Sequence, residues 1–452
     1  MKFLMINVVC GIRSTGRICT DLALELETRG HEVKIAYGRG DVPEQFQRFA
    51  VRIGTNWDVM LHGARARLID GCGLGSKKAT EAFVEWVKKY DPDVIHLHNI
   101  HGYYINIEVL FGYLKDCKKK ILWTLHDCWA FTGHCTHFDY VGCEQWTSSC
   151  NNCPQKKEYP ACNGLSRAKF NFVRKKDLFT GISNLTLVTP SDWLARLVRR
   201  SFLHEYPIVT IHNGIDIDIF KATPSDIVQQ YGLDGKKIVL GVAAIWNRKK
   251  GLDYLVQLAD KLDSTYAVAI IGVTKKQRKR LPTKVLGISQ TNSPKTLAEW
   301  YTAAEVYVNP TLEDNYPTTN LEAIACGTPI ITFDTGGCSE VFKDNSCGTI
   351  SKKDIDSLFS TIISEHGVKR ENMKINRYLL SKERAVDNYM TLLENSSKIS
   401  MKDVEIANLN VTGANGIVGI SDIGDVSIGD LNVTGGHKAI IFYQLLSEAV
   451  AA

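Results

Sequence analysis

A helix start, a short helix and a turn into an apolar strand follow one another in the stretch Asp314-Asn-Tyr-Pro-Thr-Thr-Asn-Leu-Glu322-Ala-Ile-Ala-Cys-Gly-Thr-Pro-Ile330. Pro317 suits the first helical position, where a missing N–H costs nothing. The backbone N–H groups of Thr318 and Thr319 then lie at a helix N-terminus, which attracts anions. Glu322 follows about one turn later, within reach of a hydroxyl beside that anion. A diphosphate beside sugar hydroxyls is the chemistry of a nucleotide-sugar, and a surface helix that opens with acidic residues is the alternative.

Apolar runs alternate with helical patterns along most of the chain. Ile18, Leu22 and Leu26 recur every four residues, and Gly30 follows as a helix C-cap. Strands that alternate with helices form parallel sheets covered on both faces, so we expect an α/β protein with two Rossmann-like domains facing a cleft. The expected strands are 3–9, 33–37, 94–98, 121–126, 238–243, 268–272, 306–309 and 329–333.

The pattern restarts once, which predicts the domain boundaries. We expect a first domain over residues 1–205 and a second over 206–380, with a final helix at 380–396 that packs back on the first domain. The composition then changes to Gly, Asn, Asp and Val in a tail, 401–452, where Leu-Asn-Val-Thr-Gly occurs twice. The repeat suggests small strands or a piece of a solenoid, and we assign the tail no function.

Composition excludes several classes of protein. The 452 residues are 44% hydrophobic and 23% charged, as in a soluble enzyme, and the net charge of +5 is too small to indicate nucleic-acid binding. No apolar run is long enough to span a bilayer, and the 13 cysteines suit a reducing compartment. The basic clusters at 118–120 and 275–280 are solvated loops or contacts with an anionic membrane surface.

Further segments carry chemistry. Asn213-Gly214 predicts a turn with positive φ between the two α/β halves. The run 247–251, Asn-Arg-Lys-Lys-Gly, follows a strand and offers cations to a diphosphate. Gly11-Ile-Arg-Ser-Thr-Gly16 is no Walker A loop, because Arg17-Ile18 replaces the required Lys-Ser/Thr. His98 and His126 each end a predicted strand, so both should point toward the cleft.

These segments, with Gly-Gly-Cys-Ser-Glu340, resemble the retaining glycosyltransferases of the GT-B fold, family four, and especially the enzymes of capsule and exopolysaccharide assembly. The resemblance covers residues 1–396. It implies three groups of residues: a donor-binding site, a catalytic set and an acceptor side. Lys250 belongs to both the donor-binding site and the catalytic set. The donor-binding residues would be Gly16, Arg248, Lys250, Glu313, Thr318, Thr319 and Glu322. The catalytic residues would be His98, Asp314 and Lys250, and the acceptor-side residues Arg17 and His126.

Two positions depart from the family pattern. The family has an Arg on the strand end where this chain has Ala244 and Ile245, and Arg248 is the candidate replacement. The family has Glu where this chain has Asp314, and Glu313 lies beside it, so either residue can be the functional acid.

The resemblance also implies the reaction. It predicts transfer of a sugar from a nucleotide-diphosphate sugar, UDP favoured over GDP, to a saccharide or lipid-linked saccharide in surface polysaccharide biosynthesis. It implies no divalent metal in catalysis. We expect a cytoplasmic enzyme, peripheral on the inner face of the plasma membrane. A nucleotide-sugar epimerase of the same fold and an inactive sugar-binding scaffold are the alternatives.

The segment from Cys128 to Cys162 is rich in cysteine. Structural zinc sites use four thiolates or imidazoles, and we expect such a site here, with Cys162 or His134 as alternative ligands. Free thiols or a redox pair are the other interpretations. A loop this long needs a staple, and it would shape the acceptor pocket. The expected zinc ligands are Cys135, Cys143, Cys150 and Cys153.

Overall fold

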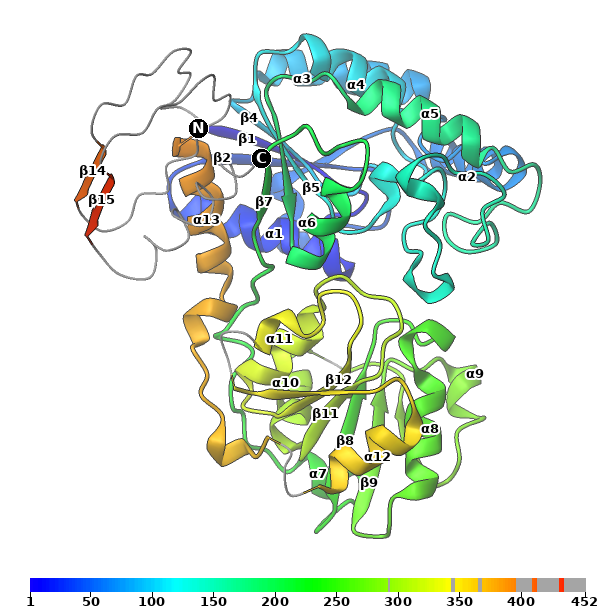
Figure 1. The fold of residues 1–452 in the computed structure, drawn as a ribbon, viewed down its shortest axis with the longest axis vertical. Helices are drawn as coiled ribbons and strands as arrows, with labels where there is room; N and C mark the ends of the chain where they lie inside the picture. The colour runs from blue at the N-terminus through cyan, green and yellow to red at the C-terminus, as the bar shows by residue number, and fades with distance from the viewer. Residues whose placement is uncertain (292, 343–345, 365–367, 396–408, 413–430, 435–452) are drawn as a thin grey trace. The chain divides into compact units, whose positions relative to one another are not determined.

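The computed structural model describes residues 1–291, 293–342, 346–364, 368–395, 409–412 and 431–434. The chain divides into two compact units, Met1–Val386 and Asp387–Ala452, which we describe separately. The first unit contains two parallel sheets, both flanked by helices (Figure 1).

The first sheet has seven parallel strands in the order β3-β2-β1-β4-β5-β6-β7. Its strands are β1 Lys2–Ile6, β2 Glu32–Tyr37, β3 Ala50–Arg52, β4 Val94–Leu97, β5 Lys120–Thr124, β6 Leu185–Thr189 and β7 Ile208–Thr210. Its helices are α1 Arg13–Thr28, α2 Asn56–Ile69, α3 Lys77–Tyr90, α4 Ile107–Asp116, α5 Ala168–Phe179 and α6 Asp192–Arg199.

The second sheet has six parallel strands in the order β10-β9-β8-β11-β12-β13. Its strands are β8 Lys237–Val242, β9 Tyr266–Ile271, β10 Val285–Ile288, β11 Val306–Asn309, β12 Ile330–Phe333 and β13 Gly348–Ser351. Its helices are α7 Ile227–Gln230, α8 Leu252–Lys261, α9 Lys275–Arg278, α10 Pro294–Ala303, α11 Thr318–Ala325 and α12 Ile355–Ile363.

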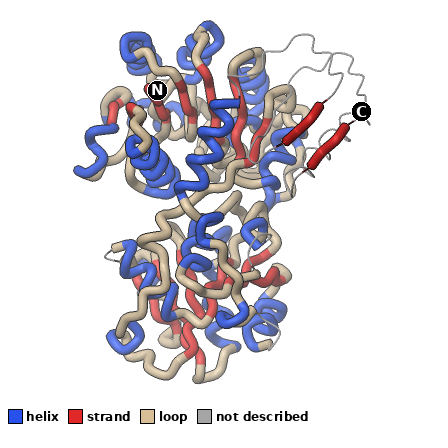
Figure 2. Tube along the Cα trace, turned by 90° about the vertical axis from the view of Figure 1, so that its left-hand side faces the viewer, coloured by secondary structure: helices blue, strands red, loops and turns tan. Residues whose placement is uncertain are grey.

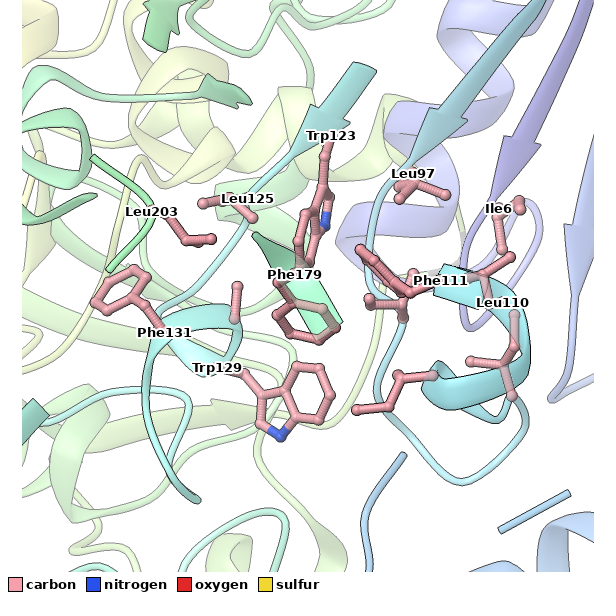
Figure 3. Packing of buried hydrophobic residues seen from close by; sticks show 14 of the residues in the cluster. Ile6, Leu97, Leu110, Phe111, Trp123, Leu125, Trp129, Phe131, Phe179 and Leu203 are labelled. Atoms are coloured by element: carbon pink, nitrogen blue, oxygen red, sulfur yellow. The ribbon is translucent and has the colours of Figure 1, made fainter. Parts of the chain in front are cut away.

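Both faces of each sheet are covered, as Figure 2 shows for strands flanked by helices. In β8, Ile238 and Leu240 belong to one buried cluster and Val239 to another, because alternate side chains point to opposite faces. In the first sheet, aromatic side chains fill one such layer: the rings of Trp123 and Phe179 are 5.0 Å apart (Figure 3). The predicted α/β fold with two parallel sheets is therefore confirmed.

The domain boundary lies later than we expected. β7 pairs with β6 and belongs to the first sheet, although it follows residue 205. We now propose the boundary between β7 and β8. The last helix, α13 Lys382–Asn395, runs from the first unit into the second, so its packing on the first domain remains a prediction.

The second unit contains one pair of described strands. β14 Leu409–Thr412 and β15 Leu431–Thr434 are the two copies of Leu-Asn-Val-Thr, and they pair in parallel with each residue opposite its counterpart. The remainder of the predicted tail lies outside the described residues. Among the helices that the structure describes, none is long and apolar enough to cross a membrane.

Candidate active site

The site is built on the loop between β11 and α11. α11 begins at Thr318, with Pro317 as its N-cap, one position earlier than we expected for the proline. A turn of two glycines packs directly on the loop: a Cβ on Gly336, whose φ is +58°, would lie 1.8 Å from the Asp314 carbonyl oxygen. The N–H of Gly337 donates to the Asn315 carbonyl at 2.8 Å. Any larger residue at 336 would therefore push the loop away.

Lys250 and Asp314 form the central ion pair of the site. Their Nζ and Oδ2 atoms are 2.6 Å apart, and both side chains remain partly exposed. Burial disfavours the charge on Lys250, but the neighbouring Asp314 outweighs it and raises the Lys250 pKa. Gly251 ends this turn with φ +77°, and a Cβ there would lie 2.1 Å from the Pro310 carbonyl oxygen. The lysine is therefore held against the loop that carries Asp314.

Glu313 is arranged differently from its neighbour. Its side chain is 5% exposed, and its carboxylate lies 2.9 Å from the Lys249 ammonium. Gln155 donates to the other carboxylate oxygen at 2.9 Å. Glu313 is thus enclosed by two partners, whereas Asp314 stays accessible beside Lys250. This geometry favours Asp314 as the functional acid.

Glu322 lies inside α11, where it is 3% exposed. Tyr301 donates its hydroxyl to Glu322 Oε2 at 3.1 Å, and the Thr318 side chain also hydrogen-bonds to Glu322. Burial raises the pKa of Glu322, while the positive charge of Arg17 acts to lower it. Arg17, which we expected on the acceptor side, therefore lies near the predicted donor carboxylate. Thr319, at the start of α11, is half-buried.

Two predicted donor residues do not join this group. Arg248 is exposed and belongs to the short turn Arg248–Lys250, which the Asn247 side chain caps by accepting from the Lys250 N–H at 3.0 Å. Gly16 packs against its own loop, since a Cβ there would lie 3.0 Å from Val9 Cγ2. Its small size therefore lets the start of α1 pack on that loop, and its place in the donor site stays a prediction.

The two histidines that end strands lie together. His98 Nδ1 and His126 Nε2 are 2.9 Å apart, and the His98 Nε2 atom is buried without a hydrogen-bond partner in the described structure. Burial lowers the pKa of His126 to about 4 and that of His98 well below its usual value, so both are neutral at pH 7. Asn315 donates to the His126 carbonyl at 3.1 Å, which links this pair to the Asp314 loop.

Sequence reasoning missed the contacts that join the two sheets. The Glu340 carboxylate accepts from the backbone N–H groups of Asp192 and Trp193, both at 2.7 Å, at the start of α6. Ser191 donates its hydroxyl to the Asn315 side chain. Glu340 had a signal, its position after Gly-Gly, but nothing local marks its partner helix. These contacts fix the second sheet's site loops against strand ends of the first.

A second polar group was also missed. His101 Nε2 lies 2.9 Å from the Asp127 carboxylate, and His101 Nδ1 lies 3.2 Å from the Tyr159 hydroxyl. Burial acts to raise the pKa of Asp127, but His101 outweighs it and lowers this pKa to about 2. This group follows the same strand ends, β4 and β5, as the two paired histidines, so it lies on the side where we expect the acceptor.

The glycine of the Asn213-Gly214 signature is needed for a different physical reason from the one we predicted. Gly214 is not among the glycines with positive φ. A Cβ on Gly214 would instead lie 2.2 Å from the Ser381 carbonyl oxygen, so the glycine allows the returning chain to pass closely. Asp216 then pairs with Lys382 at 2.7 Å.

The structure does not assemble the zinc site that we predicted in the cysteine-rich loop, so that site stays a prediction. Among the described residues no group of three or more His, Cys, Asp or Glu side chains is placed to hold a metal. Cys135 hydrogen-bonds to Cys153 and lowers the pKa of Cys153 to about 6. Cys150 accepts from the Gly133 N–H at 3.1 Å, and Cys143 is half-buried against the core.

Other side chains staple this loop. Lys175 of α5 is buried, and its ammonium donates to the carbonyls of Trp129 and Thr132 at 2.7 and 3.0 Å. His134 Nδ1 lies 2.5 Å from the buried carboxylate of Asp70. These contacts cross-link the loop to α5 and to Asp70.

Comparisons with known proteins agree with the two-sheet architecture. The family described as Glycosyltransferase Family 4 matches residues 15–219, and the family described as Glycosyl transferases group 1 matches residues 225–376. The chain is 23% identical over 421 residues to the "Putative colanic acid biosynthesis glycosyl transferase WcaC" of Escherichia coli K12, covering 87% of this chain and 100% of that protein.

Solved structures share the fold. Sucrose-phosphate synthase from Thermosynechococcus elongatus has a TM-score of 0.61 at 16% identity, with 88% of this chain and 98% of that chain covered. Anabaena Alr3699/HepE in complex with UDP-glucose has a TM-score of 0.57 at 14% identity, with 88% and 100% covered. The fold is thus the GT-B fold that the sequence predicted.

Proposed function

The chain belongs to the glycosyltransferases with family 4 and group 1 domains, and from this premise we propose its reaction. It transfers a sugar from a nucleotide-diphosphate sugar, with UDP as the nucleotide, to a saccharide acceptor carried on a lipid. The anomeric configuration is retained. The product enters surface polysaccharide, a role supported by the name of the Escherichia coli relative.

One observation carries the proposal: the Lys250–Asp314 pair at 2.6 Å beside the N-terminus of α11, with Glu322 buried one turn behind. The ammonium of Lys250 and the free N–H groups at the start of α11 suit a diphosphate whose negative charge grows as the sugar leaves. Glu322 suits the ribose hydroxyls. UDP is the nucleotide in the complexes of the Anabaena protein, which supports its choice here.

The chemistry follows from these positions. The bond between the anomeric carbon and the β-phosphate oxygen breaks while the acceptor hydroxyl attacks on the same face. The acceptor proton passes to the leaving phosphate, so no protein nucleophile is needed. When the donor binds, Lys250 exchanges part of its contact with Asp314 for the phosphate, and Asp314 then accepts from the sugar hydroxyls. His98, neutral and with Nε2 unpaired in the described structure, offers a further polar contact to the sugar.

The test is a panel of UDP- and GDP-sugars given to the purified protein with and without a lipid-linked saccharide. We expect nucleotide diphosphate to be released with an acceptor present, and the new glycosidic bond to have the donor's configuration. Conversion of the nucleotide-sugar without an acceptor would instead show an epimerase. In parallel, Glu322→Gln should weaken UDP binding in isothermal titration, with Glu299→Gln, a half-buried residue of α10, as the matched control. A protein that binds no nucleotide would contradict the proposal.

A further inference from the structure

Helix α2 carries an apolar stripe on its solvent side. Trp57, Met60, Leu61 and Leu68 recur at helical spacing and are 53–70% exposed, whereas His62 and Ala66 are the residues that α2 buries. Single exposed apolar residues are ordinary, but a continuous stripe of large ones marks an interaction surface.

The loop before α5 extends this stripe. The N–H of Leu165 donates to the Leu68 carbonyl at 2.9 Å, and a Cβ on Gly164 would lie 2.0 Å from the same oxygen. Leu165 is 69% exposed and Phe170 is 47% exposed. We call the combined surface the α2 patch. It consists of Trp57, Met60, Leu61, Leu68, Leu165 and Phe170.

Basic side chains accompany the patch. Arg65 and Arg67 of α2 are exposed, and neither forms an ion pair with a described carboxylate. Residues 59–69 and 163–170 contain no Asp or Glu, and they add Arg167 and Lys169. The single acidic residue of α2, Asp58, is occupied in capping the helix, where it accepts from the Thr55 N–H at 2.8 Å. The patch therefore presents apolar side chains with uncompensated positive charge.

This combination selects one occupant. A second copy of the chain would set the same arginines against each other, since a two-fold interface pairs identical surfaces. A bilayer with anionic lipids offers both an apolar layer for the exposed stripe and phosphate groups for the arginines. The basic clusters noted in the sequence lack this combination: Lys119 pairs with Asp91 at 2.7 Å, and α9 presents no large apolar residue.

We propose that the α2 patch docks on the surface of an anionic phospholipid bilayer. Trp57, Leu61 and Leu68 enter the boundary between headgroups and acyl chains, and Arg65 and Arg67 contact lipid phosphates.

The buried side of α2 connects this surface to the predicted acceptor side. The ring of His62 lies 6.0 Å from that of Tyr103, and His62 Nε2 accepts from the N–H groups of Gly73 and Gly75. Tyr103 belongs to the loop that follows β4, five residues after His98, and its φ of +72° is rare for a residue with a side chain. Docking would therefore bring the strand-end loops to a lipid-linked acceptor. Only this consequence rests on the proposed function.

The experiment is flotation of the full chain with vesicles, without donor or acceptor, so that it is independent of transfer. Vesicles of phosphatidylcholine with phosphatidylglycerol should carry the protein. The variant Trp57→Ser/Leu61→Ser/Leu68→Ser should lower the bound fraction at least about tenfold. The control Ile350→Ser/Ile363→Ser, with isoleucines of about half exposure on the second domain, should bind like the wild type.

Charge and depth are tested separately. Arg65→Gln and Arg67→Gln should each weaken binding about fivefold on anionic vesicles, and less in high salt. The control Lys275→Gln/Lys276→Gln should not weaken binding to anionic vesicles. Trp57→Phe should remove most of the blue shift in tryptophan emission that vesicles induce. Thermal unfolding and UDP binding report that the variants are folded.

Three outcomes would overturn the proposal. The first is failure of the wild type to float with anionic vesicles, and the second is flotation of the triple variant to the same extent as the wild type. The third is a dimer in sedimentation that the triple variant abolishes, which would assign the patch to a second copy. Transfer to a soluble acceptor with no vesicle binding would refute the docking and leave the proposed function standing.

Discussion

Gln155 donates its side-chain amide to the Glu313 carboxylate at 2.9 Å, although the two residues are 158 positions apart. Lys249 completes a triangle, since its ammonium lies 2.9 Å from Glu313 and 2.9 Å from the Gln155 side-chain oxygen. The cysteine-rich loop is thereby tied to the turn that carries Lys250. The tie encloses Glu313 and leaves the neighbouring Asp314 partly exposed.

Glu313 and Asp314 should respond differently to loss of charge. Glu313→Gln removes the nearer of the two carboxylates that pair with the largely buried Lys249, at 2.9 Å against 3.7 Å for the exposed Glu158. We therefore expect a loss of about 1–3 kcal/mol in the free energy of unfolding. Asp314→Asn should change stability little and reduce transfer severely. Denaturant unfolding and kcat/KM of both variants make the comparison. If Glu313→Gln is the variant that keeps its stability and loses transfer, the acid is Glu313.

Lys250→Ala should lower kcat/KM by about 10- to 150-fold, because a hydrogen bond to a charged group is worth about 1.5–3 kcal/mol and strengthens as the leaving group gains charge. Arg248→Ala is the matched control, since Arg248 is exposed on the same turn. Its effect should be small. Equal losses in the two variants would restore Arg248 as a donor ligand.

Stability should fall as the pH falls from 6.5 toward 4. In the folded protein burial lowers the pKa of His98 and His126, while unfolded histidine binds its proton near pH 6.5. The unfolded state therefore binds more protons in this window, and each such histidine lowers the free energy of unfolding by about 1.4 kcal/mol per pH unit. His126→Gln should remove the contribution of one proton, about 1.4 kcal/mol per pH unit, from the slope of the free energy of unfolding against pH. Denaturant unfolding at pH 7 and at pH 5 measures this slope. An unchanged slope would show that His126 is not buried as a neutral ring.

The sequence predicted what depends on local patterns. Apolar runs separated by amphipathic helices indicated both sheets, and strand ends located His98 and His126. Contacts between distant segments have no local pattern, so the Gln155–Glu313 and Glu340–α6 contacts were not predicted. Gly214 shows the same limit: its sequence neighbours suggest a turn, whereas the need for glycine comes from Ser381, far along the chain.

The cysteine-rich loop gives the last prediction. Its thiols suggested zinc, but the partner that crosses it, Lys175, comes from α5 and lies 3.4 Å from the Trp129 ring centroid. Lys175→Met keeps an unbranched side chain only one atom shorter and leaves the carbonyls of Trp129 and Thr132 without their donor. We therefore expect a loss of about 2–4 kcal/mol in the free energy of unfolding. Lys176→Met, one position along and exposed, is the control. Thermal unfolding with and without a chelator distinguishes a loop held by metal from a loop held by these side chains. A loop held by metal would unfold at a lower temperature in chelator. A loop held by Lys175 and by the His134–Asp70 pair should unfold at the same temperature in both conditions.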